Sequence, residues 1–409
     1  MSAVGPRACS VTTLEQNLSM LALNPRARLL LTGLLIAGAA LAVFGLLDAF
    51  VLVVAGEHQV ADFRPYYAGA EALLRGETLY PPVDDATLGS GRAYVYPPLT
   101  AILAVPLSLL SVTAAEATVL LLGIVAVVAT LLAVGVRDWR CYAIAFCWAP
   151  VASAVQLGNV TVFLGLAAAL AWRFRNRDVP VAICVGVTLA VKFFLWPLLI
   201  WLMTTRRFRG SLLASAVGVV VFAGSWAVIG FDGMTEYPDI LRRLQGEVEL
   251  GSYSTYVALL HAGAPFWLAR GVWLALGLTI VALFLIVDRR GADRTAFVLA
   301  IAAALALTPI VWMHYFELLL VAVAVARPRF GLVWLVPVPM WFVSPASYAE
   351  TFEVFATLGL VAMTFVLALR DSLASPERWN AVERRLSPTR RRWRYERLGA
   401  LVRGEAGEI

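Results

Sequence analysis

Apolar residues gather in long blocks along most of this 409-residue chain. A helix needs roughly 20 apolar residues to cross the hydrocarbon core of a bilayer, so the blocks predict an all-α polytopic membrane protein. We expect twelve crossings, several of them shorter than a full span: 29–54, 112–136, 141–156, 157–172, 179–191, 193–203, 211–230, 271–287, 295–311, 312–326, 331–344 and 352–369. Three prolines interrupt residues 96–111, which we interpret as a re-entrant or interfacial segment.

Two long polar stretches separate these blocks, and both are acidic. Residues 55–95 hold six acids against three arginines, and residues 231–256 hold five acids against two arginines. The short loops, such as 173–177 and 206–209, carry arginine instead. Because Lys and Arg favour the cytoplasmic side, we expect the acidic stretches outside and the arginine loops inside. The predicted domains are a cytoplasmic N-terminal segment 1–28, a membrane module 29–369 and a basic cytoplasmic tail 370–409.

Composition agrees with a membrane protein and argues against other classes. Hydrophobic residues make up 61% of the chain and charged residues 15%, against about 45–50% and 25% in soluble domains. The net charge of +6 does not indicate nucleic-acid binding, because the basic residues fall in short loops and in the tail. The four cysteines show no ligand spacing, and the sequence has no nucleotide-binding loop or Asp-x-Asp motif. We therefore expect no metal, cofactor or nucleic acid, and we expect membrane lipids as partners of the tail.

The first polar stretch holds a candidate general base beside a short amphipathic helix. After Pro65, apolar and aromatic residues recur at helical spacing, which predicts an interfacial helix on the outer leaflet. Asp62 lies just before this helix. Asp62 can serve as an N-cap that accepts backbone N–H bonds. With partial burial and a neighbouring proton donor, it can instead serve as a general base toward an acceptor hydroxyl.

Other polar residues stand at breaks in the apolar blocks. Lys192 is the only lysine in the chain, and two half-spans that meet there would present its compact ammonium to a lipid phosphate. Gln156 and Asn159 stand at another break, where they either bond across a helical hairpin or bind sugar hydroxyls. His314 lies at an outer span end, as an interface residue or a catalytic one. Glu317 follows three residues later on the same helical face and can orient that histidine.

At these residues the sequence resembles the family 87 glycosyltransferases of the GT-C superfamily, polytopic enzymes that use polyprenyl-phosphate-linked sugars. The resemblance extends over residues 62–315, about three fifths of the chain. It rests on these pieces in order: Asp62-Phe63-Arg64-Pro65-Tyr66-Tyr67 with Leu79-Tyr80, Tyr96-Pro97-Pro98-Leu99, Gln156-Leu157-Gly158-Asn159, Lys192, and Thr308-Pro309-Ile310-Val311-Trp312-Met313-His314-Tyr315. Family members often have Gly-Gln-x-Asn and Lys-Pro at the third and fourth pieces, so either carboxamide can face the substrate.

The resemblance implies a GT-C-type bundle of about 10–12 transmembrane helices with an outer-face interfacial helix. It also implies inverting transfer of a sugar, with mannose favoured, from a polyprenyl-phosphate donor to a lipid or glycan acceptor on the outer face of the plasma membrane. Asp62 would be the general base, and Lys192, His314 and Arg64 would bind the donor phosphate. The substrate-binding residues would be Tyr66, Tyr67, Gln156, Asn159 and Glu317.

Two alternatives stay open at this point. Related enzymes transfer arabinofuranose from decaprenyl phosphate, and the sequence does not separate that donor from mannose. From a different class, a lipid flippase or small-molecule transporter would line its pathway with Lys192 and the outer polar residues. The acidic outer stretches, the interfacial helix and the lack of repeat symmetry favour the enzyme.

Overall fold

The computed structural model describes residues 25–57, 59–88, 93–288, 292–343 and 350–373. The regular elements of these residues are helices, and no strand occurs among them. In chain order the α-helices are α2 (Pro25–Val54), α3 (Arg64–Arg75), α4 (Leu99–Ser108), α5 (Val112–Val134), α6 (Trp139–Ala145), α7 (Ala149–Gln156), α8 (Thr161–Arg173), α9 (Asp178–Val191), α10 (Pro197–Thr204), α11 (Phe208–Val228), α12 (Tyr237–Val248), α13 (Thr255–His261), α14 (Phe266–Asp288), α15 (Asp293–Ala306), α16 (Leu318–Ala326), α17 (Met340–Val343) and α18 (Thr351–Leu373). Short 3₁₀ helices also occur: η3 (Phe193–Leu195), η4 (Glu249–Gly251), η5 (Met313–Glu317) and η6 (Leu332–Trp334).

The prediction of an all-α polytopic membrane protein is confirmed. Within the described residues, five helices are long and apolar enough to cross a bilayer: Thr32–Val54, Val112–Val134, Phe208–Val228, Phe266–Val287 and Thr351–Leu373. Helices α7 and α8 together make a sixth candidate, but they are bent by 117° at the break between them. Five or six long spans thus replace the twelve expected crossings. Three of the other expected crossings correspond to shorter apolar helices: Asp178–Val191, Phe193–Thr204 and Met313–Ala326.

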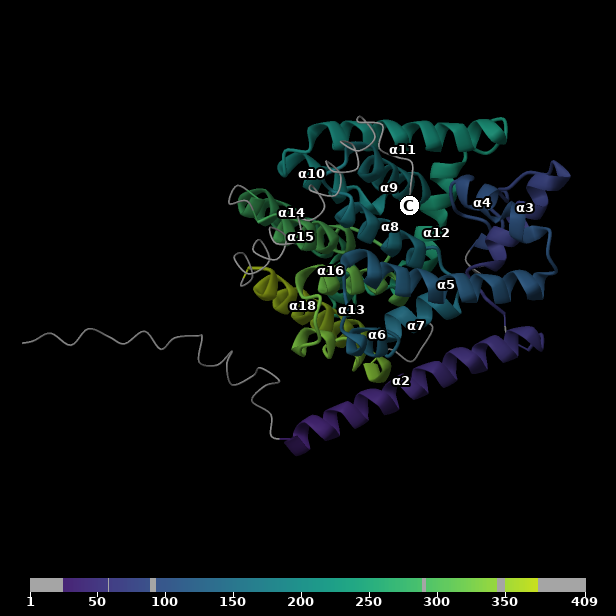
Figure 1. Ribbon diagram of the computed structural model, residues 1–409. Coiled ribbons are helices and arrows are strands. Elements are labelled where there is room, and N and C mark those ends of the chain that lie inside the picture. The colour runs from purple at the N-terminus through teal and green to yellow at the C-terminus, as the bar shows by residue number, and fades with distance from the viewer. Residues whose placement is uncertain (1–24, 58, 89–92, 289–291, 344–349, 374–409) are drawn as a thin grey trace, which may run out of the picture.

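The helices of the bundle differ in how far the rest of the protein buries them. Figure 1 shows α2 along one edge of the molecule and α11 along the opposite edge. Many large apolar side chains of α2 are exposed, as expected for contact with lipid tails: Leu29, Leu30, Leu34, Leu41, Phe44 and Leu47. In contrast, every residue of α16 is buried by the rest of the protein.

Helix α3 confirms the predicted short helix after the first span. Pro65 occupies its first turn, where a missing backbone N–H costs nothing. Gly76 ends the helix in the left-handed conformation, with φ of 68°, and donates its N–H to the carbonyls of Ala72 and Leu73. Segment 96–111, predicted as re-entrant or interfacial, contains α4, a ten-residue helix with Pro106 inside it.

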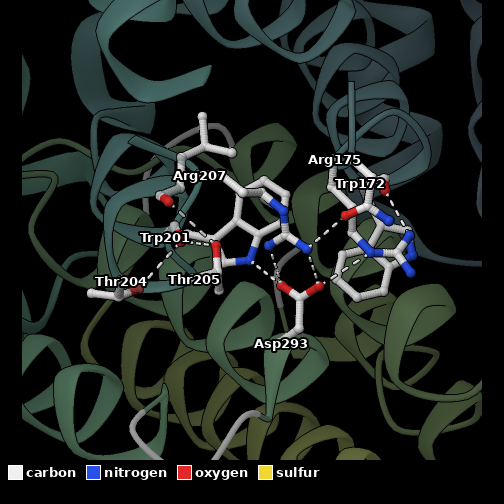
Figure 2. Close-up of polar contacts among 9 residues, drawn as sticks. Trp172, Arg175, Trp201, Thr204, Thr205, Arg207 and Asp293 are labelled. Atoms are coloured by element: carbon white, nitrogen blue, oxygen red, sulfur yellow. Dashed lines mark hydrogen bonds and ion pairs between the residues drawn. The ribbon is translucent and has the colours of Figure 1, made fainter. Parts of the chain in front are cut away.

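Two of the predicted arginine loops meet around the carboxylate of Asp293, the first residue of α15 (Figure 2). Arg207 of the α10–α11 loop binds this carboxylate through two nitrogens, at 2.9 and 2.7 Å, and Arg175 of the α8–α9 loop binds it at 3.1 Å. The indole of Trp201 donates a further hydrogen bond at 2.9 Å. These loops therefore lie on a common side of the bundle, as their charge predicted. Residues 1–24 and the arginine-rich tail from residue 374 lie outside the described part of the chain.

Candidate active site

The α7–α8 turn brings Asn159 into contact with Asp62, which is far from it in the sequence. Gly158 in this turn has φ of +63°, and a Cβ there would lie 2.5 Å from Val60 Cγ1. The glycine therefore lets the turn press against the segment that links α2 to α3. The backbone N–H of Asp62 donates to the carbonyl of Leu157 at 3.0 Å, which fastens the two segments together.

Asn159 holds the Asp62 carboxylate in a defined orientation. Its Oδ1 accepts hydrogen bonds from the backbone and hydroxyl of Thr161, at 2.9 and 2.6 Å. Because Oδ1 is thus fixed as the acceptor, Nδ2 points the other way and donates to Asp62 Oδ2 at 2.7 Å. The N-cap position of α3 is Phe63, with no side-chain cap bond. Asp62 is therefore not the helix cap, and its carboxylate faces the α7–α8 turn.

Lys192 lies at a helix break, as the sequence predicted. Helix α9 ends at Val191, Lys192 is extended with φ of −146°, and η3 begins at the next residue. Its ammonium donates a hydrogen bond to the Tyr315 hydroxyl at 3.1 Å. The ammonium also lies over two aromatic rings, 4.4 Å from the centroid of Tyr315 and 5.0 Å from that of Tyr96.

His314 completes the group from η5. Its Nδ1 lies 3.7 Å from Asp62 Oδ2, and its side chain is buried beside the ring of Tyr315. Asp62, Asn159, Lys192 and His314 thus come together from the α2–α3 link, the α7–α8 turn, the α9–η3 break and η5. The arrangement places a carboxylate able to accept a proton beside a cation able to bind an anion.

The environment of Asp62 sets its proton affinity. Its side chain keeps 28% of its surface exposed, yet protein surrounds it on most sides. This burial raises the pKa of the Asp62 carboxyl above its ordinary value, while the Asn159 hydrogen bond and the Lys192 charge lower it. A carboxylate with a raised pKa is a stronger base, once ionised, than one free in water.

Arg64 is engaged by a residue that sequence reasoning missed. Its Nε donates to Glu116 Oε1 at 2.6 Å, and the same oxygen accepts the backbone N–H of Val60 at 3.1 Å. Glu116 is only 1% exposed and lies on α5, a candidate membrane span. An acidic residue inside a predicted span is unusual, and this feature of the sequence could have identified Glu116 as a residue with a polar partner. The pair holds the segment that carries Asp62 against α5.

Three of the expected substrate residues make no hydrogen bond to the side chains of Asp62, Asn159, Lys192 and His314. Tyr67 donates to the Leu110 carbonyl at 2.8 Å, toward the α4–α5 link. Gln156 ends α7, and no hydrogen bond joins its side chain to the other described residues of the site. Both carboxyl oxygens of Glu317 are buried, and neither has a hydrogen-bond partner among the described residues. They pack against Gly165 of α8, where a Cβ would lie 2.7 Å from Oε1. No hydrogen bond joins Glu317 to His314.

The contacts of Lys192 with the rings of Tyr96 and Tyr315 were not predicted from the sequence. The sequence motifs contained Tyr96 and Tyr315, but nothing in the spacing assigned either to Lys192. Tyr66, an expected substrate residue, packs edge-on against Tyr96 with ring centroids 4.8 Å apart. Among the described residues, no three His, Cys, Asp or Glu side chains are grouped as metal ligands would be.

Comparison with known proteins gives one match. The sequence model of glycosyltransferase family 87 matches residues 94–313, just over half of the chain. No curated protein and no solved structure matches. The matched region contains Asn159 and Lys192. Asp62 lies before it and His314 follows directly after it.

Proposed function

The chain belongs to glycosyltransferase family 87, and on that premise we propose that it transfers a sugar from a polyprenyl-phosphate donor to a hydroxyl of a lipid or glycan acceptor. The donor sugar we propose is mannose. The reaction would take place on the extracytoplasmic face of the plasma membrane, to which the acidic stretches were assigned by the arginine content of the opposite loops.

One observation carries the proposal: the ammonium of Lys192, the only lysine, and the partly buried carboxylate of Asp62 belong to the same small group of side chains. Asp62 is held by Asn159 at 2.7 Å and lies 3.7 Å from His314. Lys192 has aromatic partners rather than a carboxylate as its direct contacts. A base for a hydroxyl and a cation for a phosphate are the two groups that this transfer requires.

The proposed step is an inverting displacement. The acceptor hydroxyl loses its proton to the Asp62 carboxylate as its oxygen attacks the anomeric carbon. The bond between that carbon and the phosphate oxygen breaks, and its electron pair stays on the polyprenyl phosphate. Lys192 stabilises the charge that develops on this leaving group by its own positive charge, and His314 does so as a neutral ring that donates an N–H. Positive groups aimed at such charge lower the barrier most. Arg64 contributes less, because Glu116 already engages its guanidinium.

The carboxamides take different roles in this scheme. Asn159 uses both ends of its amide within the protein, one on Thr161 and one on Asp62, so we assign it to positioning the base. The Gln156 amide makes no hydrogen bond to the part of the chain that the structure describes, and it is our candidate for binding a sugar hydroxyl. Tyr66 borders the same group of residues through Tyr96. Tyr67 and Glu317 face elsewhere and are assigned no contact with the sugars.

The direct test is transfer in proteoliposomes from labelled polyprenyl-phosphate-mannose to a panel of lipid and glycan acceptors. Wild type and Asp62→Asn are compared with Asp85→Asn, a matched control in the same acidic stretch whose carboxylate accepts hydrogen bonds from the backbone and side chain of Thr87. We expect transfer by wild type and by the control, and none by Asp62→Asn. Equal rates for all three proteins would remove Asp62 from the base role. Transfer only from a decaprenyl-phosphate-arabinose donor would replace the proposed sugar, and movement of label across the bilayer without transfer would favour a flippase.

A further inference from the structure

Three tyrosine hydroxyls hold three consecutive backbone carbonyls just before α4. Tyr237 donates to the Val95 carbonyl at 3.1 Å, Tyr80 to the Tyr96 carbonyl at 2.9 Å, and Tyr94 to the Pro97 carbonyl at 2.5 Å. We call Tyr80, Tyr94 and Tyr237 the tyrosine clamp. It fixes a short non-helical segment that bends at Tyr96.

The clamp joins the two acidic stretches. Tyr80 and Tyr94 come from the first stretch, and Tyr237 begins α12 in the second. The Tyr80 ring stacks on Trp226 of α11 at 5.3 Å and meets the Tyr237 ring edge-on at 5.4 Å. Gly233, with φ of +73°, packs so closely that a Cβ there would lie 2.6 Å from Tyr80 Cδ2. The ring of Tyr80 therefore has little room to move, and its hydroxyl stays directed at the Tyr96 carbonyl.

The residue in the middle of the clamped segment faces the proposed active site. The Tyr96 ring lies 5.0 Å from the Lys192 ammonium on one side, and Tyr315 lies 4.4 Å from it on another. A lysine side chain is a flexible four-carbon stem, so its ammonium occupies one place only where contacts fix it. Two aromatic rings attract the ammonium without cancelling its charge. A carboxylate in their place would have neutralised it.

We propose that the tyrosine clamp positions Tyr96, and that Tyr96 and Tyr315 form a neutral cage that holds the Lys192 ammonium ready for an anion. Tyr96 is then a positioning residue that acts through Lys192, and the clamp acts through Tyr96. The identity of the anion as a donor phosphate rests on the proposed function, but the cage and the clamp do not.

The single lysine makes this proposal measurable without any substrate. An amine-reactive acylating reagent modifies only Lys192 and the N-terminal amine, and peptide mapping separates the two products. The full-length protein is reconstituted in phosphatidylcholine vesicles, whose headgroups carry no primary amine, and the rate of Lys192 modification is measured. The variants are Tyr80→Phe, Tyr237→Phe, their combination and Tyr96→Ala. Tyr142→Phe is the matched control, because its hydroxyl also donates to a backbone carbonyl, that of Val136 at 2.8 Å, outside the site.

Each Tyr→Phe change in the clamp keeps the ring and removes one hydrogen bond. Such a bond favours the ordered state by a factor of about two to ten, so we expect Lys192 modification to accelerate by about that factor, and further in the double variant. Tyr96→Ala should accelerate it as well, and Tyr142→Phe should leave the rate unchanged. In the Tyr96→Ala background, removal of the clamp hydroxyls should add nothing.

Two results would overturn the inference. Modification at the wild-type rate in the double clamp variant would mean that the clamp does not position Tyr96. Clamp and Tyr96→Ala effects that simply add would mean that the clamp acts on general stability instead. Clamp-dependent modification in a protein that transfers no sugar would refute the proposed function and leave the cage intact.

Discussion

The hydrogen bond from Asn159 to Asp62 should control the pH at which the enzyme becomes active. Asn159 Nδ2 donates to Asp62 Oδ2 at 2.7 Å, and this bond stabilises the ionised carboxylate. The substitution Asn159→Leu replaces the amide by an apolar group of similar size, which removes the donor without opening space for water. Burial raises the pKa of Asp62, and without the Asn159 hydrogen bond only the Lys192 charge still lowers it.

The magnitude follows from the strength of a hydrogen bond to a charged group, about 1.5–3 kcal/mol. One pKa unit corresponds to about 1.36 kcal/mol, so the pKa of Asp62 should rise by about 1–2 units. A general base works only when it is ionised, above its pKa. The acidic limb of the profile of kcat/KM against pH should therefore move to higher pH by the same about 1–2 units, and the rate on the alkaline side should change much less.

The measurement is the initial rate of sugar transfer in proteoliposomes on both sides of this limb. Thr161→Val is the matched control, because it removes the 2.6 Å hydroxyl contact with Asn159 but keeps the Asn159–Asp62 bond. We expect the control to keep the wild-type limb within a few tenths of a unit. A limb that stays in place in Asn159→Leu, with the rate lowered equally at every pH, would show that Asn159 sets geometry alone and would refute the argument from ionisation.

Other predictions follow from the same contacts. Lys192→Met should weaken use of the donor much more than use of the acceptor, and polyprenyl phosphate should protect Lys192 of the wild type from acylation; equal losses for both substrates would indicate a structural role. Gly158→Ala should lower the melting temperature and the activity, because left-handed strain of about 1–2 kcal/mol adds to the contact with Val60. Gly56→Ala, with φ of +78° and open space around it, should show the strain alone, and an equal effect at both sites would contradict the close approach. Asp293→Asn leaves two arginines without their carboxylate and should reduce stability by at most about 3–5 kcal/mol, measured by thermal unfolding, while the acidic limb of the pH profile stays in place.

The sequence predicts the spans and the loops of this protein well where charge interrupts an apolar background. The break at Lys192 is the clearest case, because an ammonium within an apolar run is costly unless the helix ends there. Likewise, Arg175 and Arg207 were assigned to one side from loop charge alone, and both bind Asp293. Such features depend on local composition, which a sequence displays directly.

The number of full spans could not be predicted, for a physical reason. A helix buried by protein and a helix surrounded by lipid have the same apolar composition. Every residue of α16 is buried within the bundle, whereas α2 exposes most of its apolar residues, and hydropathy treats both as crossings. The 117° bend between α7 and α8 is equally invisible, because it depends on the fit of Gly158 against a distant segment.

The candidate site divides along the same line. Residue type alone identified Asp62, Lys192 and His314 as able to take part in chemistry. It did not indicate which contacts fix the position of each side chain. The choice for Asp62 between helix cap and base depended on whether its carboxylate turns toward α3 or toward Asn159, and that is decided by tertiary contact. Glu116 and Tyr96 were missed because each acts only through a partner more than fifty residues away.

Two short helices explain how these distant residues keep their places. Helix α8 has 13 residues and α9 has 14, about 20 Å each at 1.5 Å per residue. Helix α8 begins beside Asn159 and leads to Arg175, while α9 begins after the same arginine loop and leads to Lys192. Since Arg175 is bound to Asp293, the two helices share one anchor at the arginine end. The distance between Asn159, which holds the proposed base, and Lys192, the proposed phosphate-binding cation, is thus set by two paired helices rather than by loops. That is the precision an in-line displacement needs.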